Sequence, residues 1–519
     1  MALTLRNLTQ NPFTIKTLET FEDPNNAQSK SNVFPPDSRN VAQHALSFHH
    51  ENLDILVKPF ESFMLRAKGM ASSGKSIRSP SIVMRITIES DMGERHRIDT
   101  NPLYTQKSSK PFTNLIHNPS RSYTALYHPA KPVAHLVVHT NHLHNYARWM
   151  ESLPSNLPLS ALSIPGTHNS HTHYRGLPSV RCQVSSIKVQ LENGIRFLDV
   201  RVQPSHATDT QKKDLYLVHG AFPISLTGVK YFAPILETCY AFLAANPSET
   251  ILLSLKREGV GSATDEHLAA ILENHYIAPN PSRWYTGNRI PYLGDVRGKI
   301  ILVRRYDIQK PSTPLSISSK TSSSSASFPV AACGLDATEW PHNSTHAVHG
   351  PFCVQDWCEV LHPSSIPSKL QYANEHLIRS SQTTAFIPGV NTDDKNPIPP
   401  GPLHLNFLSG SNFWNKGTWP EKIAKVVNRG IEEWICMGHA LEEPVVAIDE
   451  PDRARAVDVE CAGGTTGGTL RRKAKGGDGG TGVVIMDNVG EGGDWDLVGL
   501  IVGLNMGVLM AMHAIGTGL

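Results

Sequence analysis

Residues 162–174 read LSIPGTHNSHTHY, a short apolar run that ends in polar side chains, among them His168 and Asn169. Seven more apolar runs of strand length follow, each also ending in a polar or charged cluster: GIRFLDVRV (194–202), LYLVHG (215–220), TILLSLKRE (250–258), KIILVRRYD (299–307), FCVQDWCEV (352–360), HLNFLSGSN (404–412) and GVVIMDNVGEGGD (482–494). Eight strands with polar carboxyl ends predict an α/β fold, a TIM-like (β/α)8 barrel of regular or distorted form. We expect function at the open carboxyl face, because the barrel interior is packed.

The segments around these strands complete the predicted architecture. Apolar residues at three- and four-residue steps in 228–247 and 419–435 predict covering helices. In residues 1–145 the apolar residues alternate instead, as in MRITIES (84–90), which predicts a smaller all-β sandwich in front of the barrel. The predicted domains are therefore 1–145 and 150–519. Ser-, Pro- and Gly-rich inserts near 309–345, 387–402 and 452–481 are expected to be mobile loops.

The polar strand ends favour the chemistry of phosphodiester cleavage. His168 and His219 follow different strands, so that one imidazole can accept a proton while the other donates one. Arg201 and Lys256 supply fixed cations for the charge that develops on phosphoryl oxygens. With 25 histidines in the chain, a single histidine is more often solvated or part of the core, so this hypothesis depends on the whole set.

Four of these stretches carry a family resemblance. GTHNS, GIRFLDVRV, LVHG and LLSLKRE, in this order and spacing, resemble the X domain of phosphatidylinositol-specific phospholipase C. The likeness is greater to the bacterial, metal-independent form than to the calcium-dependent eukaryotic form. It continues through RRY, VQD, NFLSGSNFWN and VVIMD over nearly all of residues 150–500. It also extends to a fungal type of the family that has an N-terminal β-domain.

The resemblance implies roles for individual residues. His168 would be the general base on the inositol 2-hydroxyl, His219 the general acid for the diacylglycerol oxygen, and Arg201 the phosphate ligand. Asp487 would orient the base, and Asn169 would support the general acid where an aspartate is usual. Four other polar positions are assigned to substrate binding: Lys256, Arg305, Asp356 and Asp199. The implied reaction converts phosphatidylinositol, or a glycosylated derivative, to diacylglycerol and inositol cyclic phosphate.

The charges at the strand ends argue against a metal cofactor. Asp199 matches a calcium ligand of the calcium-dependent relatives, but Arg201 and Lys256 stand where they have carboxylates. Two unit charges about 4 Å apart interact by several kcal/mol at a protein-like dielectric, so a cation would be repelled there. We therefore expect no cofactor and no metal ligand. Ca²⁺ is the less favoured alternative, because Asn169 also matches a calcium ligand of the eukaryotic pattern.

Two departures from the bacterial pattern keep other functions open. Asn169 replaces an aspartate, and Cys358 stands where a tyrosine often lines the inositol pocket. They favour, as an alternative, a catalytically weakened lipid-binding protein of the same fold. A metal-dependent glycerophosphodiesterase-like enzyme would share the barrel, but it normally holds its metal with paired carboxylates.

Composition and the chain ends bound the partners and the location. With 48 basic and 46 acidic side chains, the net charge of +2 gives no support for nucleic-acid binding. The 7 cysteines lack CxxC spacing, so neither a structural zinc site nor a disulfide scaffold is expected. No secretory signal is visible at the N-terminus. Residues 497–519 are long enough to cross a bilayer, but they follow the last strand and contain Asn505, which favours a closing barrel helix. We expect a cytoplasmic or peripheral-membrane protein whose partner is a phospholipid at a membrane surface.

Overall fold

The structure, a computed structural model, consists of two compact units. It describes residues 2–22, 48–66, 82–100, 109–115, 123–128, 133–140, 145–308, 334–440, 471–472 and 476–516. Unit 1 comprises residues 1–144 and 432–477, and unit 2 comprises 145–431 and 478–519. This division differs from two continuous segments, because 432–477 groups with the N-terminal residues. Of the predicted inserts 309–345 and 452–481, residues 309–333, 452–470 and 473–475 lie outside the described residues, and the described parts contain the short strands at 335–336 and 471–472. The insert 387–402 is described and contains neither helix nor strand.

Unit 1 is built from two sheets. The first has the order β21 (Arg471–Arg472), β4 (Ser62–Arg66), β1 (Ala2–Leu8), β10 (Val133–Thr140), β9 (Tyr123–His128) and β7 (Lys110–Pro111). The second has the order β3 (Phe48–Val57), β2 (Phe13–Glu22), β5 (Ile82–Ser90), β6 (Arg95–Thr100) and β8 (Thr113–Asn114). The second sheet is antiparallel throughout, and in the first only β1 and β10 run parallel.

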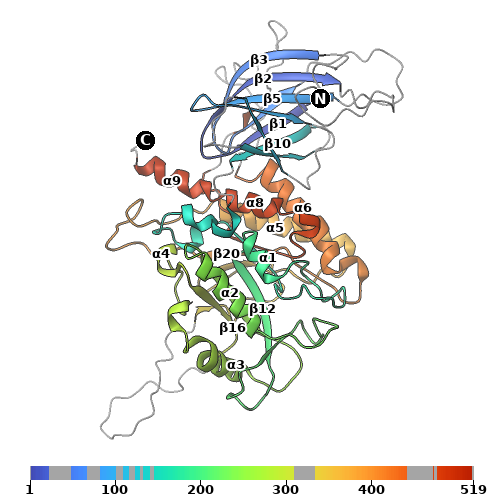
Figure 1. Cartoon of the computed structure of the whole chain (residues 1–519), viewed down its shortest axis with the longest axis vertical. Coiled ribbons are helices and arrows are strands. Elements are labelled where there is room, and N and C mark those ends of the chain that lie inside the picture. The colour runs from blue at the N-terminus through green and yellow to red at the C-terminus, as the bar shows by residue number, and fades with distance from the viewer. Residues whose placement is uncertain are drawn as a thin grey trace. The chain divides into compact units, whose positions relative to one another are not determined.

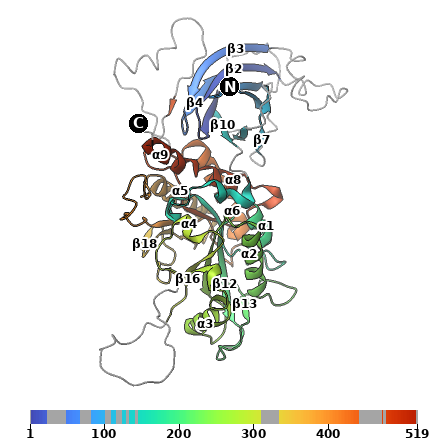
Figure 2. The same ribbon diagram turned by 60° about the vertical axis from the view of Figure 1, so that its left-hand side comes forward.

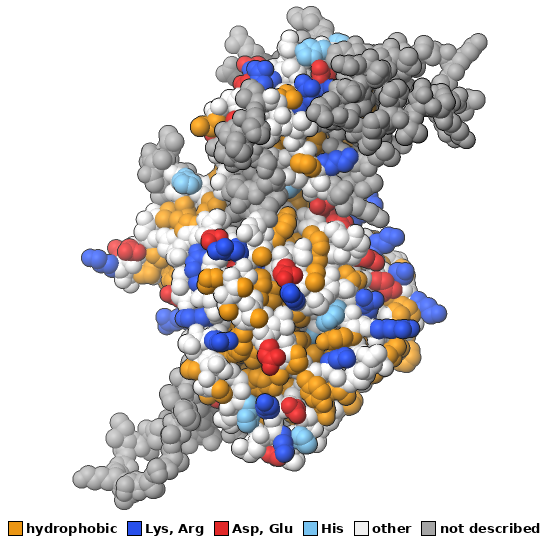
Figure 3. Space-filling view, in the orientation of Figure 1, with side chains coloured by type: hydrophobic (Ala, Val, Ile, Leu, Met, Phe, Trp, Pro, Cys, Tyr) orange, Lys and Arg blue, Asp and Glu red, His pale blue; other side chains and the backbone are white. Residues whose placement is uncertain are grey.

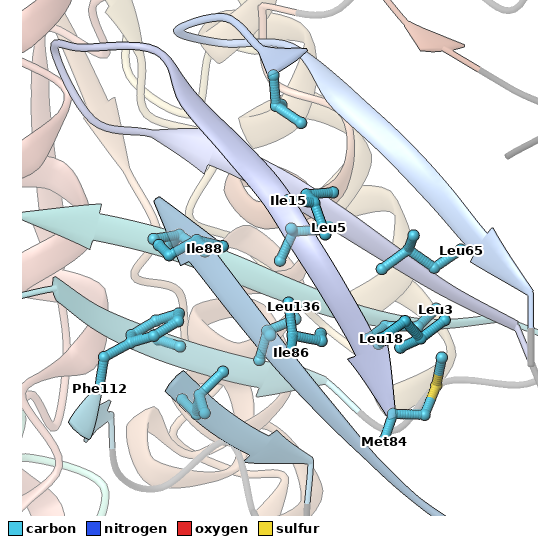
Figure 4. Packing of buried hydrophobic residues seen from close by; sticks show 14 of the residues in the cluster. Leu3, Leu5, Ile15, Leu18, Leu65, Met84, Ile86, Ile88, Phe112 and Leu136 are labelled. Carbon is cyan, nitrogen blue, oxygen red and sulfur yellow. The ribbon is translucent and has the colours of Figure 1, made fainter. Parts of the chain in front are cut away.

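A single hydrophobic core joins the two sheets of unit 1. Leu3 and Leu5 of β1 and Leu136 of β10 pack with Met84 and Ile86 of β5, and all of them are buried (Figure 4). Figure 1 shows the corresponding layers as separate sets of arrows. Burial of each such side chain contributes about 1.5–3 kcal/mol. The predicted all-β sandwich is confirmed, with the alternating apolar residues of 84–90 on its inner face.

Unit 2 contains a curled sheet of mainly parallel strands. Its order is β15 (Trp284–Tyr285), β16 (Ile300–Arg305), β14 (Ile251–Arg257), β12 (Phe197–Pro204), β11 (Ile164–Thr167), β22 (Val483–Met486), β20 (Leu403–Phe407), β19 (Phe352–Gln355) and β18 (Ala347–His349), with β17 (Leu335–Asp336) beside β16. The last parallel strand, β22, returns to pair with the first, β11. No pairing closes the sheet between β17 and β18 in the described part of the chain. The predicted barrel is therefore confirmed in its distorted, incompletely closed form.

One predicted barrel strand is wrong. LYLVHG forms β13 (Leu215–Leu217), which pairs antiparallel with the end of β12 instead of joining the parallel sheet (Figure 2). Only ten residues, 205–214, separate the two strands, and they contain no helix. A parallel crossover needs a dozen or more residues, whereas an antiparallel return needs few. His219 is thus carried on a hairpin that extends β12 beyond the parallel sheet.

Helices accompany the sheet of unit 2 as predicted (Figures 1 and 2). They are α1 (Ile187–Glu192), α2 (Ala233–Ala245), α3 (Asp265–Leu272), α4 (Leu293–Val296), α5 (Ile366–Ser381), α6 (Pro420–Met437), α8 (Asp496–Gly503) and α9 (Met506–Gly516). The C-terminal apolar segment forms α8 and α9; its 496–513 window is long and apolar enough to cross a membrane, but 67% of it is buried inside the structure. Asn505 holds it to the barrel by exchanging two 2.9 Å hydrogen bonds with the Ser163 backbone.

Gly166 explains how β11 and β12 approach closely behind the first polar cluster. A Cβ atom at this position would lie 2.8 Å from the Cβ of Phe197, which no side chain tolerates. The glycine therefore lets β11 pair with β12 at this point. The close pairing places His168 and Asn169 directly above the start of β12.

Candidate active site

His168 is fixed at the end of β11 by a partner from the last strand. Its Nδ1 lies 2.9 Å from Oδ1 of Asp487, which is almost completely buried. Because the carboxylate accepts a hydrogen bond, the proton of a neutral His168 resides on Nδ1 and the lone pair on Nε2. Gln183 donates to the His168 carbonyl at 2.7 Å and fixes the backbone. The arrangement leaves Nε2 as a base that faces the carboxyl end of the barrel.

Arg201 lies between three groups at the end of β12. Its Nη2 donates to His168 Nε2 at 2.9 Å, and its Nη1 donates to Oε1 of Glu258 at 3.0 Å. The same Nη2 lies 3.4 Å from Oδ2 of Asp199. Burial acts to lower the pKa of Arg201, but the two carboxylates more than compensate and raise it. The guanidinium is thus a permanent, oriented cation beside the base.

The carboxylates around Arg201 stay ionised. Burial alone would raise the pKa of Asp199, yet Arg201 and Arg305 hold it below its usual range. The Arg305 NH1 nitrogen lies 3.4 Å from Oδ1 of Asp199, so each carboxylate oxygen faces a guanidinium. Burial would likewise raise the pKa of Glu258, but Arg201 and the Gly220 N–H lower it to about 2. Asp199 and Glu258 therefore balance the positive charge and set the direction of the arginines.

His219 faces His168 across the site. The two ring centroids are 6.3 Å apart and the rings are perpendicular. Nδ1 of His219 lies 2.8 Å from the Val180 carbonyl, which can only accept, so Nδ1 carries a proton and Nε2 is directed elsewhere. Burial, then Arg201 and His168, lower the pKa of His219 to about 3. In the free site the ring is neutral.

The predicted substrate-binding residues are distributed around this centre. Lys256 Nζ lies 3.6 Å from Oε1 of Glu258, and burial lowers the pKa of this lysine. The Arg305 guanidinium stacks over the Trp340 ring, 4.2 Å from its centroid. Asp356 is buried just beyond β19, but no ion pair joins it to the other site residues that the structure describes. Asp356 nevertheless acts electrostatically on Arg305, whose pKa it tends to raise, so this carboxylate borders the site from the second side of the barrel.

The expected partner of Asn169 is different in the structure. Its Nδ2 lies 3.1 Å from Nε2 of His168, whereas the ring of His219 is held by the Val180 carbonyl. Asn169 adopts a positive φ of 42°, a conformation that asparagine tolerates better than most residues. Its backbone N–H donates to Oδ2 of Asp199 at 3.2 Å. Asn169 therefore contacts His168 and Asp199 in the structure, and among the described residues no hydrogen bond links it to His219, the residue that the resemblance assigned as the general acid.

Sequence reasoning missed three residues that shape the site. Glu258 stands in the quoted SLKRE stretch, but a carboxylate that holds two cations was not sought there. Trp340 lies in an irregular segment without a periodic signal. Lys369 is completely buried on α5 and donates to the Trp357 carbonyl at 2.7 Å, next to Asp356. An alternating sequence pattern indicates on which face of a strand a side chain lies, but it does not indicate the partner of a buried side chain. Of the three residues, only Glu258 could have been found from the sequence, because it stands in the quoted SLKRE stretch.

Comparisons with known proteins show which family this chain resembles. Residues 155–306 match the family model described as phosphatidylinositol-specific phospholipase C, X domain. A 1-phosphatidylinositol phosphodiesterase of Listeria monocytogenes is 37% identical over 175 residues, 32% of this chain and 50% of that protein. The Staphylococcus aureus (strain Newman) protein of the same name is 28% identical over 169 residues, 30% of this chain and 50% of its own length. The chain spans about half the length of these curated relatives. A solved structure of phosphatidylinositol-specific phospholipase C from Listeria monocytogenes covers 69% of this chain and 98% of its own at 21% identity, with a TM-score of 0.43.

Proposed function

Residues 155–306 of this chain belong to the X-domain family of phosphatidylinositol-specific phospholipase C, and on that premise we propose that the protein cleaves phosphatidylinositol or a glycosylated derivative. The inositol 2-hydroxyl attacks phosphorus and the bond from phosphorus to the diacylglycerol oxygen breaks. The products are inositol cyclic phosphate and diacylglycerol. The observation that carries the proposal is the pair of facing imidazoles, His168 and His219, with the Arg201 guanidinium beside them.

In this mechanism His168 is the general base. Nε2 takes the proton of the 2-hydroxyl, and Asp487 stabilises the resulting imidazolium through Nδ1–H. Arg201 now donates to His168 Nε2, so the incoming phosphate must draw this guanidinium toward itself and free the lone pair. Glu258 keeps the guanidinium in place during this exchange. The fixed cation then stabilises the charge that grows on the phosphoryl oxygens.

His219 is the general acid that protonates the diacylglycerol oxygen. Its low pKa in the free site means that it carries no extra proton there at neutral pH. A phosphodiester brings a negative charge next to the ring, which favours the imidazolium and raises the pKa. Bound substrate therefore favours the protonated form of His219, which then donates its proton to the diacylglycerol oxygen. We expect the raised pKa only in the complex with substrate.

We further propose that the reaction needs no metal. Ca²⁺ takes six to eight oxygen ligands, and both oxygens of Asp199 already face guanidiniums. Activity on phosphatidylinositol vesicles should therefore be unchanged in millimolar calcium chelator. Calcium restoring an activity lost to the chelator would overturn this proposal and make Asp199 and Asn169 ligands.

The proposed substrate lies in a membrane surface, and aromatic residues near the site support contact with it. Phe222 follows His219 by three residues and stacks on Phe413, with ring centroids 4.4 Å apart. Trp414, next in the chain, is 88% exposed. Aromatic rings with one wet and one apolar side favour the lipid interface. On the face drawn in Figure 3, acidic and basic side chains are interspersed between apolar ones.

A lipid-binding protein without turnover is the alternative that one observation favours. Asn169 places a neutral amide beside the base, where it competes with Arg201 for Nε2. The test is to incubate the purified protein with phosphatidylinositol vesicles and to measure inositol cyclic phosphate and vesicle binding separately. Formation of the cyclic product supports the enzyme. Binding without product supports the alternative.

A further inference from the structure

A second polar cluster lies in unit 2 away from the carboxyl end of the barrel. It consists of His346, Cys353 and His376, whose ligand atoms lie within 4.8 Å of one another. His346 directly precedes β18, Cys353 is in β19 and His376 is in α5. The Cys353 sulfur is 3.8 Å from Nδ1 of His346. Three soft or borderline ligands from three elements thus converge on one point.

The cluster lies between the sheet and helix α5. Asn406 of β20 donates to the Ala373 carbonyl of α5 at 2.9 Å, so this side of β20 faces the helix. His404 stands two residues before Asn406, hence on the same side, and is paired in register with Cys353. The ring centroids of His404 and His376 are 5.5 Å apart. His404 is therefore a fourth imidazole at the edge of the cluster.

No hydrogen bond to the described residues accounts for the burial of the His376 side chain between α5 and the sheet. The side chain is completely buried, and neither ring nitrogen has a hydrogen-bond partner among the residues that the structure describes. The face of α5 that packs on a sheet is normally apolar, as Ala373 and Leu377 are. A buried imidazole without partners costs free energy unless something occupies its lone pair. A metal ion is the ligand that would satisfy it.

The surroundings of the cluster act differently on its ligands. Burial, then His404 and Arg379, lower the pKa of His376 well below its usual value, so the ring is neutral. Burial raises the pKa of Cys353 and Arg379 opposes that rise only in part, so the free thiol keeps its proton until a metal ion displaces it. Arg379 itself opposes a bound cation, but a thiolate and nearby Glu375, 3.6 Å from Arg379, offset its charge. Metal binding would complete deprotonation of the thiol.

We propose that His346, Cys353 and His376 bind a borderline-soft divalent ion, for which Zn²⁺ is the fitting choice, with His404 or water as a fourth ligand. Tetrahedral zinc places sulfur and nitrogen ligands roughly 3.6 Å apart, close to the 3.8 Å between Cys353 and His346. The role is structural: the ion would tie the segment before β18 to β19 and α5. The proposal departs from the expectation that the chain has no structural zinc site, which rested on the lack of CxxC spacing.

Another group, His168, Cys182 and Asp487, also has metal-ligating atoms close together. It belongs to the active site already described, where His168 and Asp487 bond each other at 2.9 Å. The Cys182 thiol has its pKa raised well above the usual value by burial, which disfavours a thiolate. An experiment must therefore distinguish metal binding at this group from metal binding at the proposed site.

The test uses the full chain, stripped of metal with a chelator and titrated with Co²⁺ and with Zn²⁺. Cobalt gives a thiolate-to-metal absorption band when cysteine is a ligand, and zinc binding is read from the thermal unfolding temperature. Cys353→Ser and His346→Ala are the test variants; His346 is exposed, so its replacement should leave the fold intact. Cys182→Ser and the exposed His362→Ala are the matched controls.

The expected result is one ion per chain, a thiolate band and a zinc-dependent rise in unfolding temperature in the wild type and both controls. Cys353→Ser should lose the band, and His346→Ala should weaken binding at least about tenfold, at the low end of what disturbing a metal site costs. The proposal is overturned if the wild type shows no band, if Cys353→Ser keeps it, or if Cys182→Ser alone abolishes it. None of these readouts depends on phosphodiesterase activity.

Discussion

The two sides of the barrel in unit 2 contribute differently to the candidate site. The first side, β11 to β16, supplies the groups that would touch the phosphodiester: His168, Arg201 and His219. The second side, β19 to β22, supplies Asp487, which would orient the proposed base, and Asp356, which acts electrostatically on Arg305. The family match, 155–306, covers the first side only. The residues with proposed chemical roles thus lie mainly in the part of the chain that matches the family model.

The difference shows which positions the proposed reaction constrains. A group that transfers a proton needs a fixed type and place, whereas a residue that lines or supports the pocket can be exchanged for another of suitable size. On the second side, α5 packs on the sheet through polar residues such as Lys369 and His376. Both residues lie outside the stretch that matches the family model, which ends at residue 306.

The largest effect should come from the imidazoles of the first side. His168→Ala and His219→Ala should each lower turnover of phosphatidylinositol at least about a hundredfold, the usual scale for a general acid or base. Both lie at strand or hairpin ends, so far-UV circular dichroism should be unchanged. The exposed His206→Ala, in the turn before β13, is the control and should turn over normally. Near-normal turnover of either test variant would end the two-histidine mechanism.

Asp487→Asn tests whether Asp487, on the second side of the barrel, acts only by positioning His168. We expect kcat to fall about ten- to a hundredfold, the range for removing an orienting partner, with KM little changed. The amide keeps the shape but cannot stabilise the imidazolium of His168 as a carboxylate does. Steady-state kinetics on mixed vesicles separates the two constants. A rise in KM with unchanged kcat would mean that Asp487 binds substrate instead.

The pH dependence should differ between the free and the bound site. The pKa of His219 is about 3 in the free site, because of burial and Arg201. Bound phosphate raises it, so the proton is held to higher pH in the complex. The alkaline limb of kcat should therefore lie at least about one pH unit above that of kcat/KM, since the two report the bound and the free enzyme. Coincident limbs would show that phosphate does not charge the acid.

The smallest effect concerns the support of Asp356. Lys369→Met removes the donor to the partly buried Trp357 carbonyl, at a cost of about 1 kcal/mol in the free energy of unfolding. Gln355 remains satisfied by the Trp357 N–H. KM should rise a few-fold while kcat holds, as measured by urea unfolding and steady-state kinetics. Unchanged stability and KM would leave Lys369 without a role in the site.

The sequence predicted the sheet and the sandwich, because strand ends and alternating apolar residues are local features. The roles of the first-side residues came from the family resemblance and stay predictions. It could not predict that Arg471 and Arg472, in a Gly-rich stretch, pair with β4 of unit 1. It misplaced LYLVHG, although the short link 205–214 already argued for an antiparallel return. The partner of Asn169 depends on side-chain direction, which residue spacing does not report. The His346, Cys353 and His376 cluster is assembled from three elements and has no contiguous signature.

The pairing of β11 with β22 has a consequence for the order in which the protein is made. Asp487 lies 319 residues after the His168 that it orients. At a ribosomal rate of about 5–20 residues per second, Asp487 is synthesised roughly 15–65 seconds after His168. A nascent chain that lacks the last strand leaves one edge of β11 unpaired and His168 without the Asp487 carboxylate. If the proposed mechanism holds, such a chain would cleave lipid more slowly than the finished protein.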